Sequence, residues 1–221
     1  VVGNISFKKT VNRLAPLLGN IPASKSLFKR IPSPQYKPVS STIYKEITQA
    51  NCAIGKPALS IRDPRRFKLH LLNNILGGPS MNSRLNLALR ENHGLVYSIE
   101  SVYQAFTDTG FIGIYYGTEE KAAAKAKKIV LKEIEKICTK KLGSMQLHMG
   151  KEQAIGQMAM AEENYSGLML VYGKNLLDKG KIEPLESIFS SIRSCTAGEL
   201  MELANEIYDA DNFSFLTYLP K

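Results

Sequence analysis

The chain has 221 residues, of which 44% are hydrophobic, so it can bury the core of one large domain or two small ones. Its net charge is +9, but the lysines are dispersed and interleave with glutamates, which favours solvated helix faces over a surface that binds nucleic acid. Three distant cysteines argue against a disulfide framework, and no apolar run approaches the ~20 residues of a membrane span.

The N-terminal segment, residues 1–38, is expected to continue a domain that precedes this chain. It predicts a short strand at Val1–Ile5, a helix capped by Ser6, and a linker rich in proline and serine over residues 20–41. The sequence has no initial Met and no signal-peptide pattern, so we treat it as a fragment of a soluble protein whose compartment cannot be read. The remainder, residues 39–221, is expected to form the C-terminal domain.

The first half of that domain mixes strands and helices. Asp63 followed by Pro64 marks the start of a helix with an apolar stripe, which Gly77 and Gly78 end. The other elements predicted here are a strand over 43–54, a helix from Ser80 or Asn82 to Asn92, and strands over 96–105 and 111–116 that flank a hairpin turn.

The second half is mainly helical. Helical patterns cover residues 118–138, 144–164 and 166–177, a capping box at Thr196–Glu199 opens a helix to about Tyr208, and a final strand covers 213–218. Strands and helices do not alternate regularly along the chain. This order predicts an α+β fold, with an antiparallel sheet and helices packed on one face.

One run of sequence carries most of the functional information. Residues 77–98 read GGPSMNSRLNLALRENHGLVYS, with Arg90 at the end of a predicted helix and Tyr97 on the next strand. Two long polar side chains so placed can converge on one point, and both can donate hydrogen bonds to a peptide carbonyl oxygen. The alternative from the residues alone is structural: Arg90 would cap helix-end carbonyls and pair with a carboxylate, and Tyr97 would be a half-buried strand aromatic.

This run resembles the second domain of the pitrilysin/insulinase zinc metallopeptidases, a family that includes the processing peptidases, and the resemblance covers most of the chain. It implies the same fold, an antiparallel sheet backed by helices. The catalytic signature of the family, His-x-x-Glu-His, is absent from this sequence. The resemblance therefore implies the non-zinc C-terminal half of a metalloendopeptidase, inactive alone, with peptide as substrate and zinc supplied by an N-terminal half or a partner chain.

Within the resemblance, Arg90 and Tyr97 match the family's arginine and tyrosine, which bind and polarise substrate backbone near the scissile bond. Arg84 also matches, and we expect it to pair with an acidic residue and fix its helix. His70, His93 and His148 lie far apart in sequence, so we predict no zinc site in this chain.

Two other functions stay open at this point. The chain could be a non-catalytic relative that acts as a structural or partner subunit, because the family includes subunits without zinc ligands. A basic nucleic-acid-binding module is the other rival, and it would show salt-sensitive binding. Association of like chains into a homo-oligomer is also open.

Overall fold

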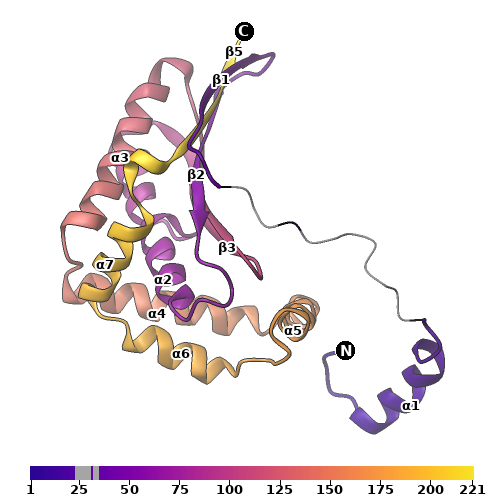
Figure 1. Cartoon of the computed structure of the whole chain (residues 1–221). Coiled ribbons are helices and arrows are strands. Elements are labelled where there is room, and N and C mark those ends of the chain that lie inside the picture. The colour runs from indigo at the N-terminus through magenta and orange to yellow at the C-terminus, as the bar shows by residue number, and fades with distance from the viewer. Residues whose placement is uncertain (23–30, 32–34) are drawn as a thin grey trace. The chain divides into compact units, whose positions relative to one another are not determined.

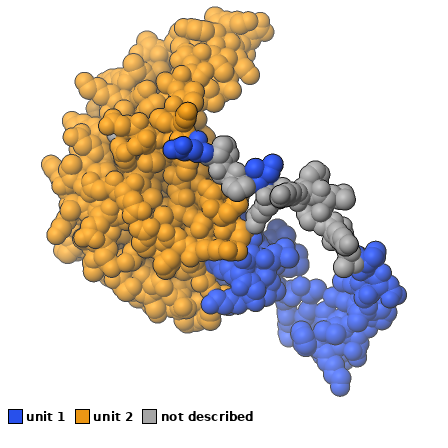
Figure 2. All heavy atoms as spheres, viewed as in Figure 1, with its two compact units in different colours: residues 1–35, 158–182 blue, residues 36–157, 183–221 orange. Residues whose placement is uncertain are grey.

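The computed structural model describes residues 1–22, 31 and 35–221. It forms two compact units (Figures 1 and 2). One contains residues 1–35 and 158–182, and the other contains residues 36–157 and 183–221. The linker predicted over 20–41 lies in large part outside the described residues.

The first unit carries helices α1 (Phe7–Leu18) and α5 (Tyr165–Lys179). The Ser6 side chain accepts a hydrogen bond from the backbone N–H of Lys9, so the predicted cap is confirmed. Val1–Ile5 is not a strand, because no other described segment pairs with it. Helix α1 has an apolar face, yet none of its residues is buried.

The second unit is built on a sheet of five strands in the order β1-β5-β2-β4-β3. The strands are β1 (Ser40–Lys45), β2 (Ala50–Ala58), β3 (Val96–Ala105), β4 (Gly110–Thr118) and β5 (Ser214–Pro220). All neighbours are antiparallel except β1 and β5, which are parallel. The expected α+β fold with helices on one face of the sheet is confirmed, and three of the four strand pairs are antiparallel as expected. The pair of β1 and β5 is parallel because β1 and β2 run in opposite directions, so β5, which lies between them, can be antiparallel to only one of them.

The helices of this unit cover one face of the sheet. Helices α2 (Arg66–Gly77), α3 (Ala123–Thr139) and α7 (Ala197–Ile207) pack together there, as Figure 1 shows. Their buried faces meet alternate residues of the strands, such as Ile54, Ile112 and Ile114. The other face of the sheet therefore carries the remaining alternate residues, and these make up most of the strand residues that line the cavity described below.

Five further helical segments of the described residues belong wholly or in part to the second unit. They are η1 (Asn86–Glu91), η2 (Glu120–Ala122), α4 (Ser144–Ala161), α6 (Leu185–Ser194) and η3 (Ala210–Asn212), and α4 runs from the second unit into the first. The capping box before α7 is present as predicted, with Thr196 and Glu199 bonded to each other's backbone N–H groups. No described helix is both long enough and apolar enough to cross a bilayer.

Tyr36 attaches the start of the second unit to its sheet. Its hydroxyl lies 3.0 Å from the carbonyl oxygen of Asn212 and 2.8 Å from Oγ of Ser214. Ser214 Oγ also accepts a hydrogen bond from the backbone N–H of Val39, and Val39 O accepts one from Phe215. The chain is therefore bonded to β5 before β1 begins.

Candidate active site

Arg90 lies on a single widened helical turn. The segment η1 is a π-helix, in which the N–H of Asn92 bonds the carbonyl of Leu87, five residues earlier. Gly94, at φ +57°, ends the segment in a left-handed conformation that glycine adopts without strain. A π-turn inserts one residue into a helix and is frequent at functional sites, because it changes where the following side chains point.

Tyr97 lies on a comparable irregularity in β3. The pairing of β3 with β4 shifts between Val96 and Ile99, so Tyr97 and Ser98 lie opposite a single residue of β4, Gly117. This is a β-bulge, which re-aims side chains locally. An extra residue in the helix and another in the strand thus set the directions of the two predicted site residues.

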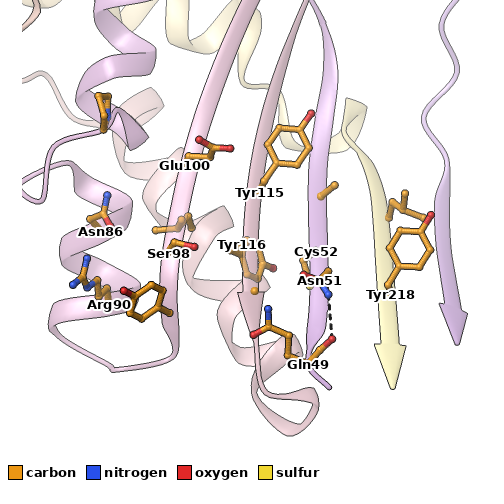
Figure 3. A pocket seen from close by; sticks show the side chains of 16 residues that line it. Gln49, Asn51, Cys52, Asn86, Arg90, Ser98, Glu100, Tyr115, Tyr116 and Tyr218 are labelled. Carbon is orange, nitrogen blue, oxygen red and sulfur yellow. Dashed lines mark hydrogen bonds between the residues drawn. The ribbon is translucent and has the colours of Figure 1, made fainter. Parts of the chain in front are cut away.

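Both side chains reach the same open cavity. The cavity has a volume of about 930 Å³, and Arg90 and Tyr97 both line it (Figure 3). The guanidinium carbon of Arg90 lies 5.8 Å from the ring centroid of Tyr97, and Tyr97 is 87% exposed. Apart from Tyr97, the Arg90 side chain has one partner among the described residues, a long ion pair with Glu91 at 3.6 Å from Nε to Oε1. Their donors are therefore accessible to a ligand.

Most of the rest of the cavity is the face of the sheet that the helices leave open (Figure 3). Its lining residues come mainly from η1 and from strands β2, β3, β4 and β5, and Gln49 and Pro79 lie just outside these elements. The lining residues are Gln49, Asn51, Cys52, Ala53, Pro79, Asn86, Ser98, Ile99, Glu100, Tyr115, Tyr116, Gly117, Leu216 and Tyr218, in addition to Arg90 and Tyr97.

The floor of this face is shallow because β4 carries glycines at Gly113 and Gly117. A methyl group at Gly113 would come within 2.7 Å of the Tyr115 hydroxyl, and one at Gly117 would come within 2.8 Å of the Gln49 side-chain nitrogen. The side chains of Tyr115 and Gln49 therefore lie along the sheet over these glycines. The floor they form has polar atoms and an aromatic ring within reach of a bound chain.

The charge in the cavity is carried by two residues of its lining. Burial raises the pKa of the Cys52 thiol and that of the Tyr116 hydroxyl, so both groups are neutral near pH 7. Among the lining residues, only Arg90 and Glu100 are of charged types. The cavity is thus neutral as a whole but has two distinct charged positions.

A largely buried ion pair joins the residues just before η1 to helix α3. Nε of Arg84 lies 3.4 Å from Glu133 Oε2, and the other carboxylate oxygen of Glu133 accepts a hydrogen bond of 2.5 Å from Lys136. Glu133 is 7% exposed. The acidic partner predicted for Arg84 is confirmed, and it lies on helix α3.

The residues described here do not form a zinc site. No group of three or more His, Cys, Asp or Glu side chains in the described part of the chain is arranged to hold a metal ion. Nδ1 of His93 lies 2.7 Å from the carbonyl oxygen of Ala88, and His70 is exposed on α2. The donor set therefore does not fit the zinc that the family resemblance implies for the complete enzyme.

Sequence reasoning missed most of the cavity beyond Arg90 and Tyr97. Glu100 and Tyr115, which are paired across β3 and β4, drew no attention. The available signal was the alternation of small or polar residues with apolar ones in β4, where the pattern Gly-Phe-Ile-Gly-Ile-Tyr-Tyr-Gly has one face rich in glycine. This pattern indicates that one face of β4 is rich in glycine, but it does not predict which residues of the other strands lie on that face.

Comparison with known proteins places the chain in a family. Residues 1–154 match the model described as "Peptidase M16 inactive domain". The zinc protease YmxG of Bacillus subtilis is 30% identical over 213 residues, which are 96% of this chain and 51% of that protein. A zinc protease of Rickettsia felis is 29% identical over 95% of this chain and 50% of its own length. The chain thus spans about half the length of these relatives.

Solved structures share the fold. A peptidase M16 inactive domain from Pseudomonas fluorescens has a TM-score of 0.87 at 19% identity, and the match covers 100% of this chain and 53% of that one. A protease from Helicobacter pylori also has a TM-score of 0.87, at 16% identity over 99% of this chain and 54% of its own. With the sequence matches, these results confirm the family expected from residues 77–98: the chain belongs to the peptidase M16 family and corresponds to its inactive, C-terminal domain.

Proposed function

We propose that this chain is the non-zinc, peptide-binding half of a zinc metalloendopeptidase. The observation that carries the proposal is the convergence of Arg90 and Tyr97 on one open cavity, with 5.8 Å between the guanidinium carbon and the ring centroid. A structural role for the pair would leave both side chains engaged within the protein. Instead Tyr97 is 87% exposed, and the carboxylate nearest to Arg90 among the described residues, that of Glu91, lies at a distance where an exposed ion pair contributes little.

The chemistry available to this pair is the binding of a main-chain oxygen. The guanidinium presents a rigid fork of N–H donors, and the phenol presents one O–H donor. Both can donate to a peptide carbonyl, and their hydrogen bonds strengthen as that oxygen gains negative charge during hydrolysis. Arg90 and Tyr97 would then orient the substrate and stabilise the oxyanion, while the cavity floor receives the neighbouring residues of the peptide.

The zinc and the remaining catalytic groups would come from an N-terminal half or from a separate chain. Two observations support this division. The chain matches only about half the length of each relative named as a zinc protease, and helix α1 has an apolar face although none of its residues is buried. We propose that residues 1–38 belong to the preceding domain, that 39–221 form the substrate-binding domain, and that the missing half covers α1.

The test is peptide cleavage by the complete protein, or by this chain combined with its zinc-bearing half. Arg90→Ala and Tyr97→Phe are each expected to lower turnover by about tenfold or more, because each removes a donor that acts on the transition state. Arg62→Ala is the matched control, since Arg62 is exposed and lies outside the cavity lining. Its turnover should equal that of the wild type.

Two results would contradict the proposal. Unchanged turnover in both site variants would remove the roles assigned to Arg90 and Tyr97. Absence of cleavage when the zinc-bearing half is present and folded would favour the alternative, a non-catalytic relative that acts as a structural or partner subunit.

A further inference from the structure

We propose that the cavity contains a subsite for a basic side chain, lysine or arginine, of the bound peptide, and that the Glu100 carboxylate recognises it. The inference rests on the proposed function, because it assumes a peptide held at Arg90 and Tyr97. It adds a preference among peptides that the grip on main-chain atoms does not provide, since every residue of a peptide offers the same carbonyl oxygen.

The first argument is the charge of Glu100. It is exposed on β3 and lines the cavity, and no ion pair or hydrogen bond joins its carboxylate to another described residue. The chain as a whole has a net charge of +9, and most of its other carboxylates lie outside this cavity. A carboxylate without a partner, in a concave site between low-dielectric walls, attracts a ligand cation more strongly than one on a flat surface.

The second argument is the aromatic surface beside it. Tyr115 is paired with Glu100 across the strands, is 40% exposed, and lies along the sheet over Gly113. A ring face next to a carboxylate suits an ammonium or guanidinium group, which the ring quadrupole attracts. Another tyrosine of the lining, Tyr218, already meets a cation in this way, because Nζ of Lys45, a residue outside the lining, lies 4.9 Å from its ring centroid.

The third argument is geometric and depends on the bulge. In a regular strand, residues three apart point to opposite faces, so Tyr97 and Glu100 would be on different sides of the sheet. The shift in pairing between Val96 and Ile99 brings both to the cavity side. Three strand residues span about 10 Å, so a basic side chain one or two residues from the gripped carbonyl reaches the carboxylate.

Binding of short peptides to the whole 221-residue chain tests the subsite. The probes are three octapeptides with blocked termini and one central residue that is lysine, glutamine or glutamate, so that terminal charges play no part. Wild-type protein is expected to bind the lysine peptide about five- to tenfold more tightly than the glutamine peptide, and the glutamate peptide most weakly. The preference should shrink as salt is raised from 50 to 500 mM, as an ion pair requires.

The variant Glu100→Gln should remove the preference for lysine and leave the affinity for the glutamine peptide within twofold. The matched control is Glu135→Gln, which makes the same change of charge at an exposed residue of α3 outside the cavity. It should retain the full preference. Tyr115→Leu should reduce the preference by about half on a logarithmic scale, because it removes the ring and keeps the carboxylate.

The outcomes separate this proposal from the one it rests on. Equal binding of the three peptides by the wild type, with all three weakened in Arg90→Ala, would overturn the subsite and keep the main-chain role of Arg90. A preference for lysine that survives in Glu100→Gln would also overturn it. A preference lost in Glu100→Gln, with Arg90→Ala unchanged, would support the subsite and contradict the role of Arg90. Failure of all three peptides to bind at millimolar concentration would overturn both.

Discussion

The ion pair behind the site offers the most direct test of the structure. Replacing Arg84 by Met keeps the apolar stem and removes the charge that faces Glu133. Since Glu133 is 7% exposed, the variant leaves a nearly buried carboxylate with one partner fewer. We expect Arg84→Met to lower the free energy of unfolding and to loosen η1, the segment that carries Arg90.

The magnitude follows from what remains around Glu133. Removing one partner of a buried ion pair typically costs about 3–5 kcal/mol. Here Lys136 stays bonded to the same carboxylate at 2.5 Å, and its side chain is 38% exposed, so part of the charge is still compensated. We therefore expect a loss of about 2 kcal/mol. The exposed pair of Arg90 with Glu91 is the contrast, and Glu91→Gln should cost less than about 0.5 kcal/mol.

Urea unfolding followed by far-ultraviolet circular dichroism measures both values, and hydrogen exchange of the η1 amides reports the local effect. The double variant Arg84→Met with Glu133→Gln should lose less than the sum of the single variants, because it leaves no buried charge unpaired. If Arg84→Met unfolds within 0.5 kcal/mol of the wild type, the pair is solvated and the argument from burial is wrong.

Three further predictions concern the sheet, a helix start and a thiol. Gly55→Ala should lower the free energy of unfolding in urea by about 1–3 kcal/mol, because the new methyl group lies 2.8 Å from the backbone oxygen of Ile112. Gly113→Ala should cost under about 1 kcal/mol, because its methyl group meets only the side chain of Tyr115, which can move. Hydrogen bonds from Lys68 and from Thr196, the cap of α7, lower the pKa of Glu199 to about 2. The contribution of the Glu199 carboxylate to the stability of the fold should therefore be complete above about pH 4.5 and decline as the pH falls toward 2. This contribution should be absent at every pH in Glu199→Gln. Burial raises the pKa of Cys52, so iodoacetamide at pH 8 should modify it far more slowly in folded than in urea-unfolded protein, as mass spectrometry of its peptide would show.

Each of these has a clear contradicting result. Equal stability of the two glycine variants would mean that the sheet relaxes at Gly55. A constant difference between wild type and Glu199→Gln from pH 2 to pH 7 would contradict the pKa assigned to Glu199. Rapid modification of Cys52 in the folded chain would show that the thiol is accessible.

The sequence predicted the elements whose patterns are long and regular. Helix α3 was expected from its apolar stripe, and Ala126, Val130 and Ile134 are buried as that stripe requires. Two errors have physical causes. Residues 43–54 were read as one strand, but no glycine or proline marks the turn after Lys45 that separates β1 from β2. Helix α6 was missed because its serines are weak helix formers, and burial of Ile192 against other elements stabilises it.

The site was predictable only in part for a related reason. Arg90 and Tyr97 stand in a recognisable run of sequence, so their types and spacing could be read directly. The π-turn and the bulge that aim them leave no periodic signal, because each is a single extra residue whose position depends on the pairing partner. Counting alternate residues from Tyr97 would have placed Glu100 on the wrong face of the sheet, so its place in the cavity required coordinates.

The attachment at Tyr36 has a mechanical consequence. A force applied to the backbone on the N-terminal side of Tyr36 acts first on the contacts of the Tyr36 hydroxyl with Asn212 and Ser214. It reaches β1 only after these contacts. A pull on β1 along its axis loads its hydrogen bonds with β5 in shear, so these bonds share the load instead of opening one at a time. A load that arrives through the segment before β1 is therefore shared among several bonds, and the sheet can keep its shape under a force that would peel away an edge strand bonded only at its end.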